Sequence, residues 1–182
     1  MPVPQLGRVM SVIKDPMVSD HFTLEIPMVP TGAGDVEPLM IHCQSTVKPG
    51  VTVDEVLVAL FGHTFVYAGR KVFNHDLNVT FVENARGTIM RTIEKWDELI
   101  RGSQTQHGRF KNGGSGGGNG YAADGKLKIY DNPGDLVLEY TLYNMWPASL
   151  PEAALDGTAS NLITHSVGFK FDWYDRTGGY SS

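Results

Sequence analysis

The sequence predicts a mainly β protein of the α+β class, an antiparallel β-barrel or sandwich with one packed α-helix and a long β-hairpin arm. Most apolar segments alternate with polar residues at every second position, which is the period of a half-buried strand. Only one segment has the period of an amphipathic helix, and strands do not alternate with helices. Glycine is abundant, at 21 of 182 residues, and charged residues make up only 19%, as in a turn-rich β protein with much covered surface.

Length and composition exclude several classes of protein. A chain of 182 residues fits one domain, so we expect residues 1–182 to form a single unit. The one cysteine, Cys43, can form neither an internal disulfide nor a multi-cysteine zinc site. No apolar run approaches the roughly 20 residues of a membrane helix, so we expect a chain made in the cytosol with no membrane insertion. The net charge of −5 argues against a general nucleic-acid binder.

The first quarter of the chain predicts two strands and a loop. Residues 21–26 predict a strand, because three apolar residues alternate with polar ones. A loop rich in proline and glycine is expected at 27–38, followed by a less regular strand at 39–47. Pro49 and Gly50 predict that the chain then turns.

Residues 51–67 predict a long hairpin arm, broken by Gly62. Inside it lies an uninterrupted apolar run: Val56, Leu57, Val58, Ala59, Leu60 and Phe61. Such a run places apolar side chains on both faces of a strand, whereas a strand covered on one side only would alternate. The arm is therefore either a central strand of this domain or a strand covered by another molecule.

One helix is expected, at about residues 85–101, after a strand at 77–82. Its apolar residues fall on a single stripe: Ile89, Ile93, Trp96 and Ile100. Asn84 is expected to cap the first turn, because its side-chain oxygen can accept hydrogen bonds from free backbone N–H groups. Gly102 is expected to end the helix.

The remaining elements are a loop and three strands. Residues 103–125 are polar and rich in glycine, which predicts a surface loop whose role the sequence leaves open. Strands are expected at 126–130 and 136–143, with extended chain at 146–152. The last strand, at 163–173, is the strongest local signal, because its apolar residues fall on one face for nearly its whole length.

The sequence predicts no catalytic, cofactor or metal site. Residues 120–126 match the first seven positions of the phosphate-binding loop G-x-x-x-x-G-K, but Leu127 stands where Ser or Thr would hold magnesium, and no helix follows. His42 and Cys43 are neighbours in a predicted strand, so their side chains point to opposite faces and cannot grip one metal ion. The acidic residues form no identifiable acid–base pair. We therefore expect a protein that is not an enzyme and needs no cofactor.

Several segments in a fixed order carry a family resemblance. They are an early strand that ends near residues 25–26, residues 43–50 (CQSTVKPG) ahead of the arm, a strand at 77–81 that leads to a helix ending in residues 94–96 (EKW), residues 140–150 (YTLYNMWPASL), and the terminal strand at 163–173 with Asp175. Their order, over about residues 18–175, resembles the tail tube protein family of contractile bacteriophages. That family is related in fold to the tube proteins of R-type bacteriocins and type VI secretion.

The resemblance implies six copies that close into a ring, with rings stacking into a hollow tube whose inner wall is a β-barrel shared between subunits. It also implies a structural role in the virion tail, assembly in the host cytoplasm, and contacts with the sheath, the tape-measure protein, the baseplate and the tail terminator. DNA would pass through without specific binding. If each copy gives roughly four strands, a spacing of ~4.8 Å and a tilt of ~40° give a backbone diameter of about 48 Å, wide enough for duplex DNA.

The arm and its Pro49-Gly50 hinge are the expected ring-forming element. The residues that we assign to self-assembly are Pro49, Gly50, Val56, Leu57, Val58, Leu60, Phe61 and Phe65. The loop at 31–38 and the chain termini are expected to add further contacts. Glu139 and Asp172, on the polar faces of predicted strands, are candidates for an acidic inner wall that would repel phosphates and let DNA slide.

Two alternatives stay open at this point. The first is the tube of a DNA-free contractile injection particle, or the tube-like ring that starts the tail at the baseplate. The second, from another class, is a monomeric β-barrel that binds a small ligand among its interior aromatic residues. The state of association of the purified protein separates the second alternative from the tube.

Overall fold

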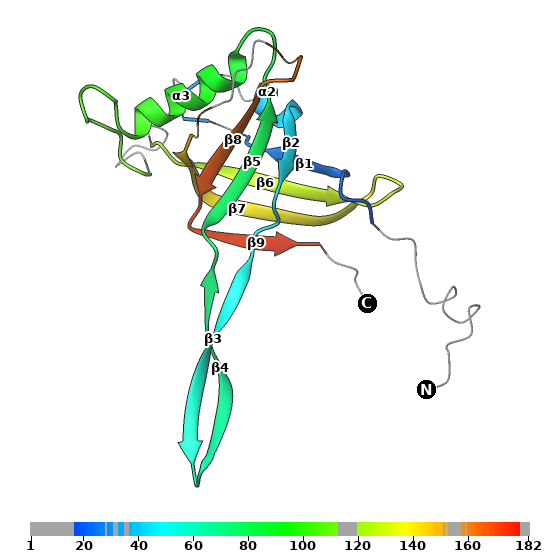
Figure 1. Ribbon diagram of the computed structural model, residues 1–182, viewed down its shortest axis with the longest axis vertical. Helices are drawn as coiled ribbons and strands as arrows, with labels where there is room; N and C mark the ends of the chain where they lie inside the picture. The colour runs from blue at the N-terminus through cyan, green and yellow to red at the C-terminus, as the bar shows by residue number, and fades with distance from the viewer. Residues whose placement is uncertain are drawn as a thin grey trace.

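The computed structural model describes residues 17–27, 29–30, 33–34, 37–112, 120–150, 152, 158 and 160–178. The termini, residues 113–119 of the predicted glycine-rich loop and much of the predicted contact loop at 31–38 lie outside the described residues. In the described part, antiparallel strands predominate, which confirms the predicted fold class (Figure 1). The elements are β1 (Phe22–Glu25), α2 (Glu37–Ile41), β2 (Cys43–Thr46), β3 (Val51–Leu60), β4 (His63–Phe73), β5 (Asp76–Val82), α3 (Thr88–Ile100), β6 (Ala123–Tyr130), β7 (Leu136–Ser149), β8 (Thr164–Lys170) and β9 (Trp173–Thr177).

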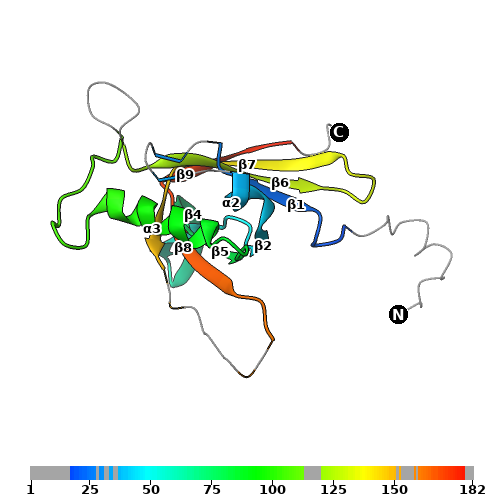
Figure 2. The same ribbon diagram turned by 90° about the horizontal axis from the view of Figure 1, so that it is seen from above.

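The body of the protein consists of two sheets that share β7. Sheet A contains β1, β6, the first part of β7, and β9. Sheet B contains the end of β7 followed by β8, β5 and β2. The strands of the two sheets cross at a steep angle in Figure 1. Figure 2 shows α3 and sheet B on one side of sheet A, and no helix or strand of the described residues covers the opposite face.

The strand β7 passes from one sheet to the other at Asn144. This residue has φ 55, in the left-handed region that asparagine tolerates better than most residues. Its backbone N–H donates to Asp124 Oδ1 at 3.0 Å, and its side-chain Nδ2 donates to Asp172 Oδ2 at 2.8 Å. These bonds fix the corner where the chain also leaves β8 for β9.

The predicted single strand at 163–173 is therefore wrong, because the chain bends at Asp172 and continues in the other sheet. The backbone N–H of Phe171 still donates to His75 O, whereas that of Asp172 donates to Tyr143 O. Phe171 is buried on the same apolar face as the preceding strand residues. The alternation thus continues into the bend, and the sequence pattern does not show the break.

The core lies between the two sheets and is covered by α3 on one side. Ile89, Ile93 and Trp96 of the predicted helix stripe are fully buried, which confirms the stripe. The Trp96 indole Nε1 donates to Tyr121 O at 2.6 Å, and its ring centroid lies 5.9 Å from that of Phe169. The buried side chains of both sheets and of α3 form one hydrophobic cluster.

The helix α3 begins at Thr88, slightly later than the predicted residue 85. The side-chain oxygen of Asn84 accepts hydrogen bonds from the backbone N–H groups of Arg86 and Thr88, at 3.0 and 3.1 Å. The predicted capping role of Asn84 is thereby confirmed. Gly87, at φ 63, lets the chain turn into the helix.

The predicted strand at 39–47 is wrong in its first part, where the short helix α2 precedes β2. Leu39 is buried in the core from this helix. A segment of five residues is too short for its apolar spacing to distinguish a helix from a strand, which is why the pattern was misleading. The protein accordingly has a second helix that the sequence did not predict.

The strands β3 and β4 form a two-stranded arm that projects from the body along the longest axis of the molecule (Figure 1). They pair only with each other, so the interpretation of the arm as a central strand is wrong. The predicted turn at Pro49-Gly50 is also wrong, because β3 continues in the direction of β2. Gly50 instead joins body to arm, and its carbonyl accepts from Asn74 N at 3.0 Å.

Candidate assembly surfaces

The arm carries apolar side chains on both of its faces. Residues directly opposite each other in an antiparallel pair share a face. One face holds the pairs Val56–Tyr67 and Val58–Phe65, with Leu60 beside them. The other face holds the pair Leu57–Val66, whose side chains are both 63% exposed. An isolated subunit therefore presents both faces of an apolar hairpin to water.

Charge is confined to the base of the arm. The run from Val56 to Gly69 contains no Asp, Glu, Lys or Arg, whereas Asp54, Glu55, Arg70 and Lys71 follow closer to the body. Contiguous exposed apolar patches usually mark interaction sites, whereas single exposed apolar residues are normal on a protein surface. The outer part of the arm has this character on both faces.

The tip of the arm is a two-residue turn made by Phe61 and Gly62, between the paired residues Leu60 and His63. Phe61 has φ 50 and Gly62 has φ 78, the signs of a type I′ turn. Such turns favour Asn-Gly, and a bulky residue in the left-handed region costs on the order of 1–3 kcal/mol. The Phe61 side chain is also 99% exposed.

The residues predicted for self-assembly fall into two groups. Val56, Leu57, Leu60, Phe61 and Phe65 are exposed on the arm, and Val58 is half-buried there. Pro49 and Gly50 lie at the joint between body and arm, where Pro49 is buried. The first group therefore lies together on the projecting hairpin, and the second group lies where the hairpin joins the body.

Among the described residues, three strands of the body leave a backbone edge unpaired: β1 and β9 at the two edges of sheet A, and β2 at the edge of sheet B. An open strand edge is a template for pairing with another chain. The sequence pattern identified β1 and β2 as strands but did not predict β9, and it gave no sign of which strands would lie at an edge.

The uncovered face of sheet A carries paired charges, together with the stacked rings of Tyr143 and Trp173. Lys128 Nζ lies 2.7 Å from a carboxylate oxygen of Glu25, and Lys126 Nζ lies 2.9 Å from Glu139 Oε1. The hydrogen bond that Lys128 donates to Glu25 is the main reason that the pKa of Lys128 is raised above its ordinary value. Glu139, predicted as an inner-wall acid, thus lies on this face beside a lysine.

Asp172 lies at the bend between β8 and β9 rather than on a strand face as expected. It forms an ion pair with Lys111 and accepts the Asn144 bond described above. Burial alone would raise the pKa of Asp172, but these two partners hold it below its ordinary value. Glu139 and Asp172 belong to separate ion pairs, and the structure does not bring them together.

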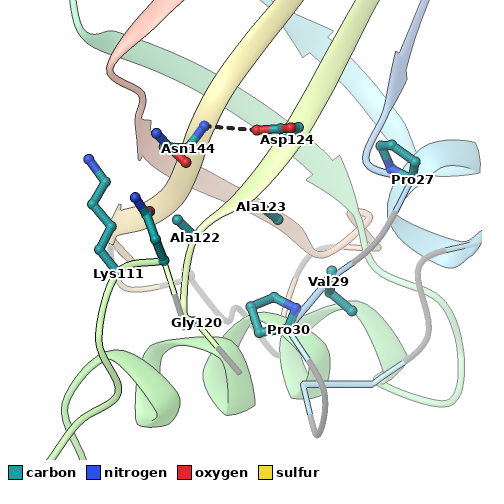
Figure 3. A pocket seen from close by; sticks show the side chains of 10 residues that line it. Pro27, Val29, Pro30, Lys111, Gly120, Ala122, Ala123, Asp124 and Asn144 are labelled. Atoms are coloured by element: carbon teal, nitrogen blue, oxygen red, sulfur yellow. Dashed lines mark hydrogen bonds between the residues drawn. The ribbon is translucent and has the colours of Figure 1, made fainter. Parts of the chain in front are cut away.

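The same corner borders an open pocket of about 400 Å³ (Figure 3). Pro27, Val29 and Pro30 line one side, and Asp124 with Asn144 line the other. Because Asp124 accepts a hydrogen bond from the Asn144 backbone, it stabilises the bend in β7.

Over the described residues there is no cluster of three or more His, Cys, Asp or Glu side chains that could hold a metal ion. Within that same part, no helix is long and apolar enough to cross a membrane.

The sequence model of the phage tail tube protein family matches residues 15–177. The chain belongs to this family. No match is found among curated proteins. The family assignment agrees with the resemblance that the sequence carried, and it makes the protein a structural tail tube component of a phage-like system.

Solved structures share the fold of this tail tube protein over nearly its whole length. The PVC sheath–tube complex of an extracellular contractile injection system, in its extended state, includes a chain with a TM-score of 0.61, 13% identity, and coverage of 97% of this chain and 99% of that one. The PVC sheath/tube terminator gives 0.64 and 14%, covering 92% and 100% of the two chains. The baseplate of the anti-feeding prophage gives 0.61 and 14%, covering 91% and 98%.

The single cysteine of the tail tube protein is expected to resist alkylation at neutral pH. Burial raises the pKa of the Cys43 thiol to about 11, so the reactive thiolate is scarce. Mass spectrometry after treatment with maleimide at pH 7 should show the unmodified chain, with labelling rising in denaturant. Rapid and complete modification of the folded protein would contradict the burial of this thiol. An introduced cysteine can therefore serve as the reactive position in the experiments below.

Proposed function

We propose that this tail tube protein forms hexameric rings, that the rings stack into a hollow tube, and that the tube conducts DNA in a phage tail. The observation that carries the proposal is the exposed apolar arm. In a single subunit both faces of the arm expose apolar side chains to water, which is unfavourable. Packing against a second copy would remove this exposure. In this proposal Val56, Leu57, Val58, Leu60 and Phe65 pack on a neighbouring copy.

Ring closure is proposed to occur along sheet A, where β9 of one copy would meet β1 of the next. Both strands have an unpaired edge, and each is short, with five and four residues. Sheet A contributes four strands per subunit. Six such sheets at ~4.8 Å spacing and ~40° tilt give a barrel of about 48 Å backbone diameter, which supports a channel wide enough for duplex DNA.

The uncovered face of sheet A is proposed to line the channel, with Glu139 in the wall and Asp172 near it. The other face of this sheet is already occupied by the core, sheet B and α3, so only one face is free to meet a lumen. Its lysines are paired with carboxylates, which supports a wall without free cationic sites for phosphate. A polyanion would then slide without being held.

The proposed partners are the tail sheath, the tape-measure protein, the baseplate and the tail terminator. Two of the similar structures are described as a sheath–tube complex and a sheath/tube terminator, and a third as a baseplate. The proposed place of the protein is the virion tail, after assembly in the host cytoplasm. A DNA-free injection particle is the second candidate, because all three of these structures come from contractile injection systems or the anti-feeding prophage. Capsid and packaging genes beside this gene would favour the phage.

The direction of the inner wall can be tested with two matched cysteine variants. Glu139→Cys lies on the uncovered face of sheet A, and Glu94→Cys lies on the exposed face of α3. In assembled tubes, a small maleimide should label both variants, whereas a maleimide fixed on a bead wider than the tube should capture only Glu94→Cys. Dissociated subunits of both variants should be captured. Capture of intact Glu139→Cys tubes along their length would place this face outside and contradict the proposed wall.

A further inference from the structure

Two aromatic rings lie stacked on the uncovered face of sheet A. Tyr143 of β7 and Trp173 of β9 are directly opposite each other in an antiparallel pair, so their side chains share a face. Their ring centroids lie 5.3 Å apart, and the ring planes meet at 26°. Tyr143 follows Glu139 by four residues along β7, so both project from the same, uncovered face. We call these two residues the aromatic pair.

The aromatic pair is not part of the hydrophobic core. Tyr140 and Leu142, on the opposite face of β7, supply the buried side chains of this strand. Trp173 is 45% exposed, although it is the largest side chain on this face. An exposed strand position is filled equally well by threonine, since β-branched residues favour strands. A contact made by the exposed indole is the physical reason that would favour tryptophan here.

Carboxylates flank the aromatic pair. The hydrogen bond with Asp175 is the main reason that the pKa of Tyr143 is raised above its ordinary value, and the nearby charge of Asp124 raises it further. The lysine that acts on Tyr143 is Lys126, which is already bonded to Glu139. The charge that remains around the two rings is therefore negative.

Asp175 has room for a further ligand. It lies two residues beyond Trp173 on the same face of β9, which is a separation of about 7 Å along the strand. A carboxylate accepts about four hydrogen bonds, and the bond with Tyr143 occupies one of these positions. None of the ion pairs among the described residues involves Asp175, and the residue is exposed.

An exposed indole beside free carboxylate oxygens selects a cation. The face of a tryptophan ring attracts the positive group of arginine or lysine. Arginine fits better, because its planar group stacks on the ring while its N–H groups point sideways and can donate to Asp175. Phosphate groups would be repelled by Asp175 and Asp124, so nucleic acid is the disfavoured ligand.

We propose that Trp173, stacked on Tyr143 and flanked by Asp175, binds an arginine side chain of a polypeptide held inside the tube. The inference rests on the proposed function, in which this face of sheet A lines the channel, and it names the chemistry of the partner there. One such contact at an exposed site is weak. Six copies in a ring offer the same site at one height, so a basic segment that engages several sites is held by all of them together.

Fluorescence anisotropy with a labelled peptide of alternating arginine and glycine tests the site. The peptide should bind both to dilute subunits and to assembled tubes. The same peptide with citrulline in place of arginine has nearly the same shape without the charge, and it should not bind. This comparison uses the wild-type chain, so it decides the question even where a substitution perturbs folding.

Substitutions assign the binding to the aromatic pair. In dilute subunits Trp173→Leu should weaken peptide binding about five-fold, whereas Trp173→Phe, which keeps an aromatic face, should stay within about two-fold of the wild type. Asp175→Asn should weaken binding to a similar degree as Trp173→Leu. The matched control Glu94→Gln removes a charge from the exposed face of α3 and should leave binding unchanged. Circular dichroism should show the same folded spectrum for all variants.

Three results would overturn the inference. They are equal binding by the Trp173→Leu variant and the wild type, equal binding of the citrulline and arginine peptides, and tighter binding of oligothymidylate than of the arginine peptide. The last result would make the aromatic pair a stacking site for bases.

The same measurements separate this inference from the proposed function. If the wild-type chain forms no tubes but its subunits bind the arginine peptide through Trp173, the proposed function fails and the arginine site is supported. If tubes form and the peptide does not bind to them, the inference alone fails.

Discussion

Replacing Leu57 with Asp is expected to abolish assembly and leave a folded single subunit. Leu57 is exposed on the arm opposite Val66, far from the core, so the substitution removes no packing from the core. In the assembled protein the new carboxylate would be buried against apolar side chains, at a cost of about 3 kcal/mol or more. That cost corresponds to a roughly 100-fold higher concentration for assembly. Light scattering and negative-stain microscopy measure the effect, and Leu60→Asp should behave in the same way.

The matched control is Gln104→Asp, which adds the same charge on an exposed loop of the body. It should assemble at the wild-type concentration, which excludes net charge as the cause. Circular dichroism should show the same folded spectrum for all three proteins. Tubes that persist in the Leu57→Asp variant would show that the arm faces are not assembly surfaces.

Replacing Glu83 with Gln is expected to lower the free energy of unfolding by about 3 kcal/mol, because it breaks a buried charged network. Oε1 of Glu83 accepts from the backbone N–H groups of Asn84 and Ile89, and Oε2 accepts from that of Met90 at 2.9 Å. Oε2 also lies 3.2 Å from His165 Nε2, and both side chains are less than a tenth exposed. The amide NH₂ of Gln would face donors there. Urea unfolding in the Leu57→Asp background measures the change without coupling to assembly.

The same network gives a defined dependence on pH. Burial alone would raise the pKa of Glu83, but the hydrogen bonds from Met90, Asn84 and Ile89 and the nearby His165 hold it below its ordinary value. A carboxyl whose folded pKa is lowered contributes its full stability above the unfolded value of about 4.3, and loses it as the pH falls through the folded value. The difference between the wild type and Glu83→Gln should therefore shrink as the pH falls below ~4. The control Glu94→Gln, on the exposed face of α3, should change stability by less than about 0.5 kcal/mol. A Glu83→Gln difference that stays the same or grows below pH ~4 would contradict a buried, charged Glu83.

Periodicity predicted the elements that have one covered face. The stripe through Ile93 and Trp96 identified α3, and alternation identified β1 and β5, because burial on one side leaves a regular pattern in the sequence. The pattern failed where local segments were short or where the chain changed partner. The short helix α2 and the bend at Asp172 are both set by contacts with distant segments, such as the bond from Asp172 N to Tyr143 O, and these are not visible in local spacing.

The candidate assembly surfaces were less predictable from the sequence than the strands and the helix α3. An apolar run on both faces of one strand indicated that Leu57 and Leu60 would need a cover, and none of the residues that the structure describes provides it. The ion pair between Glu139 on β7 and Lys126 on β6 was not predictable either, because it depends on the register between these two strands.

Electron microscopy of the purified, concentrated protein, combined with light scattering on the same sample, tests the central proposal most directly. We predict six-fold rings with an open centre that stack into tubes as the concentration rises, with the single subunit confined to dilute solution. A protein that stays folded and monomeric at the highest concentration, with its arm still exposed to solvent, would contradict the account.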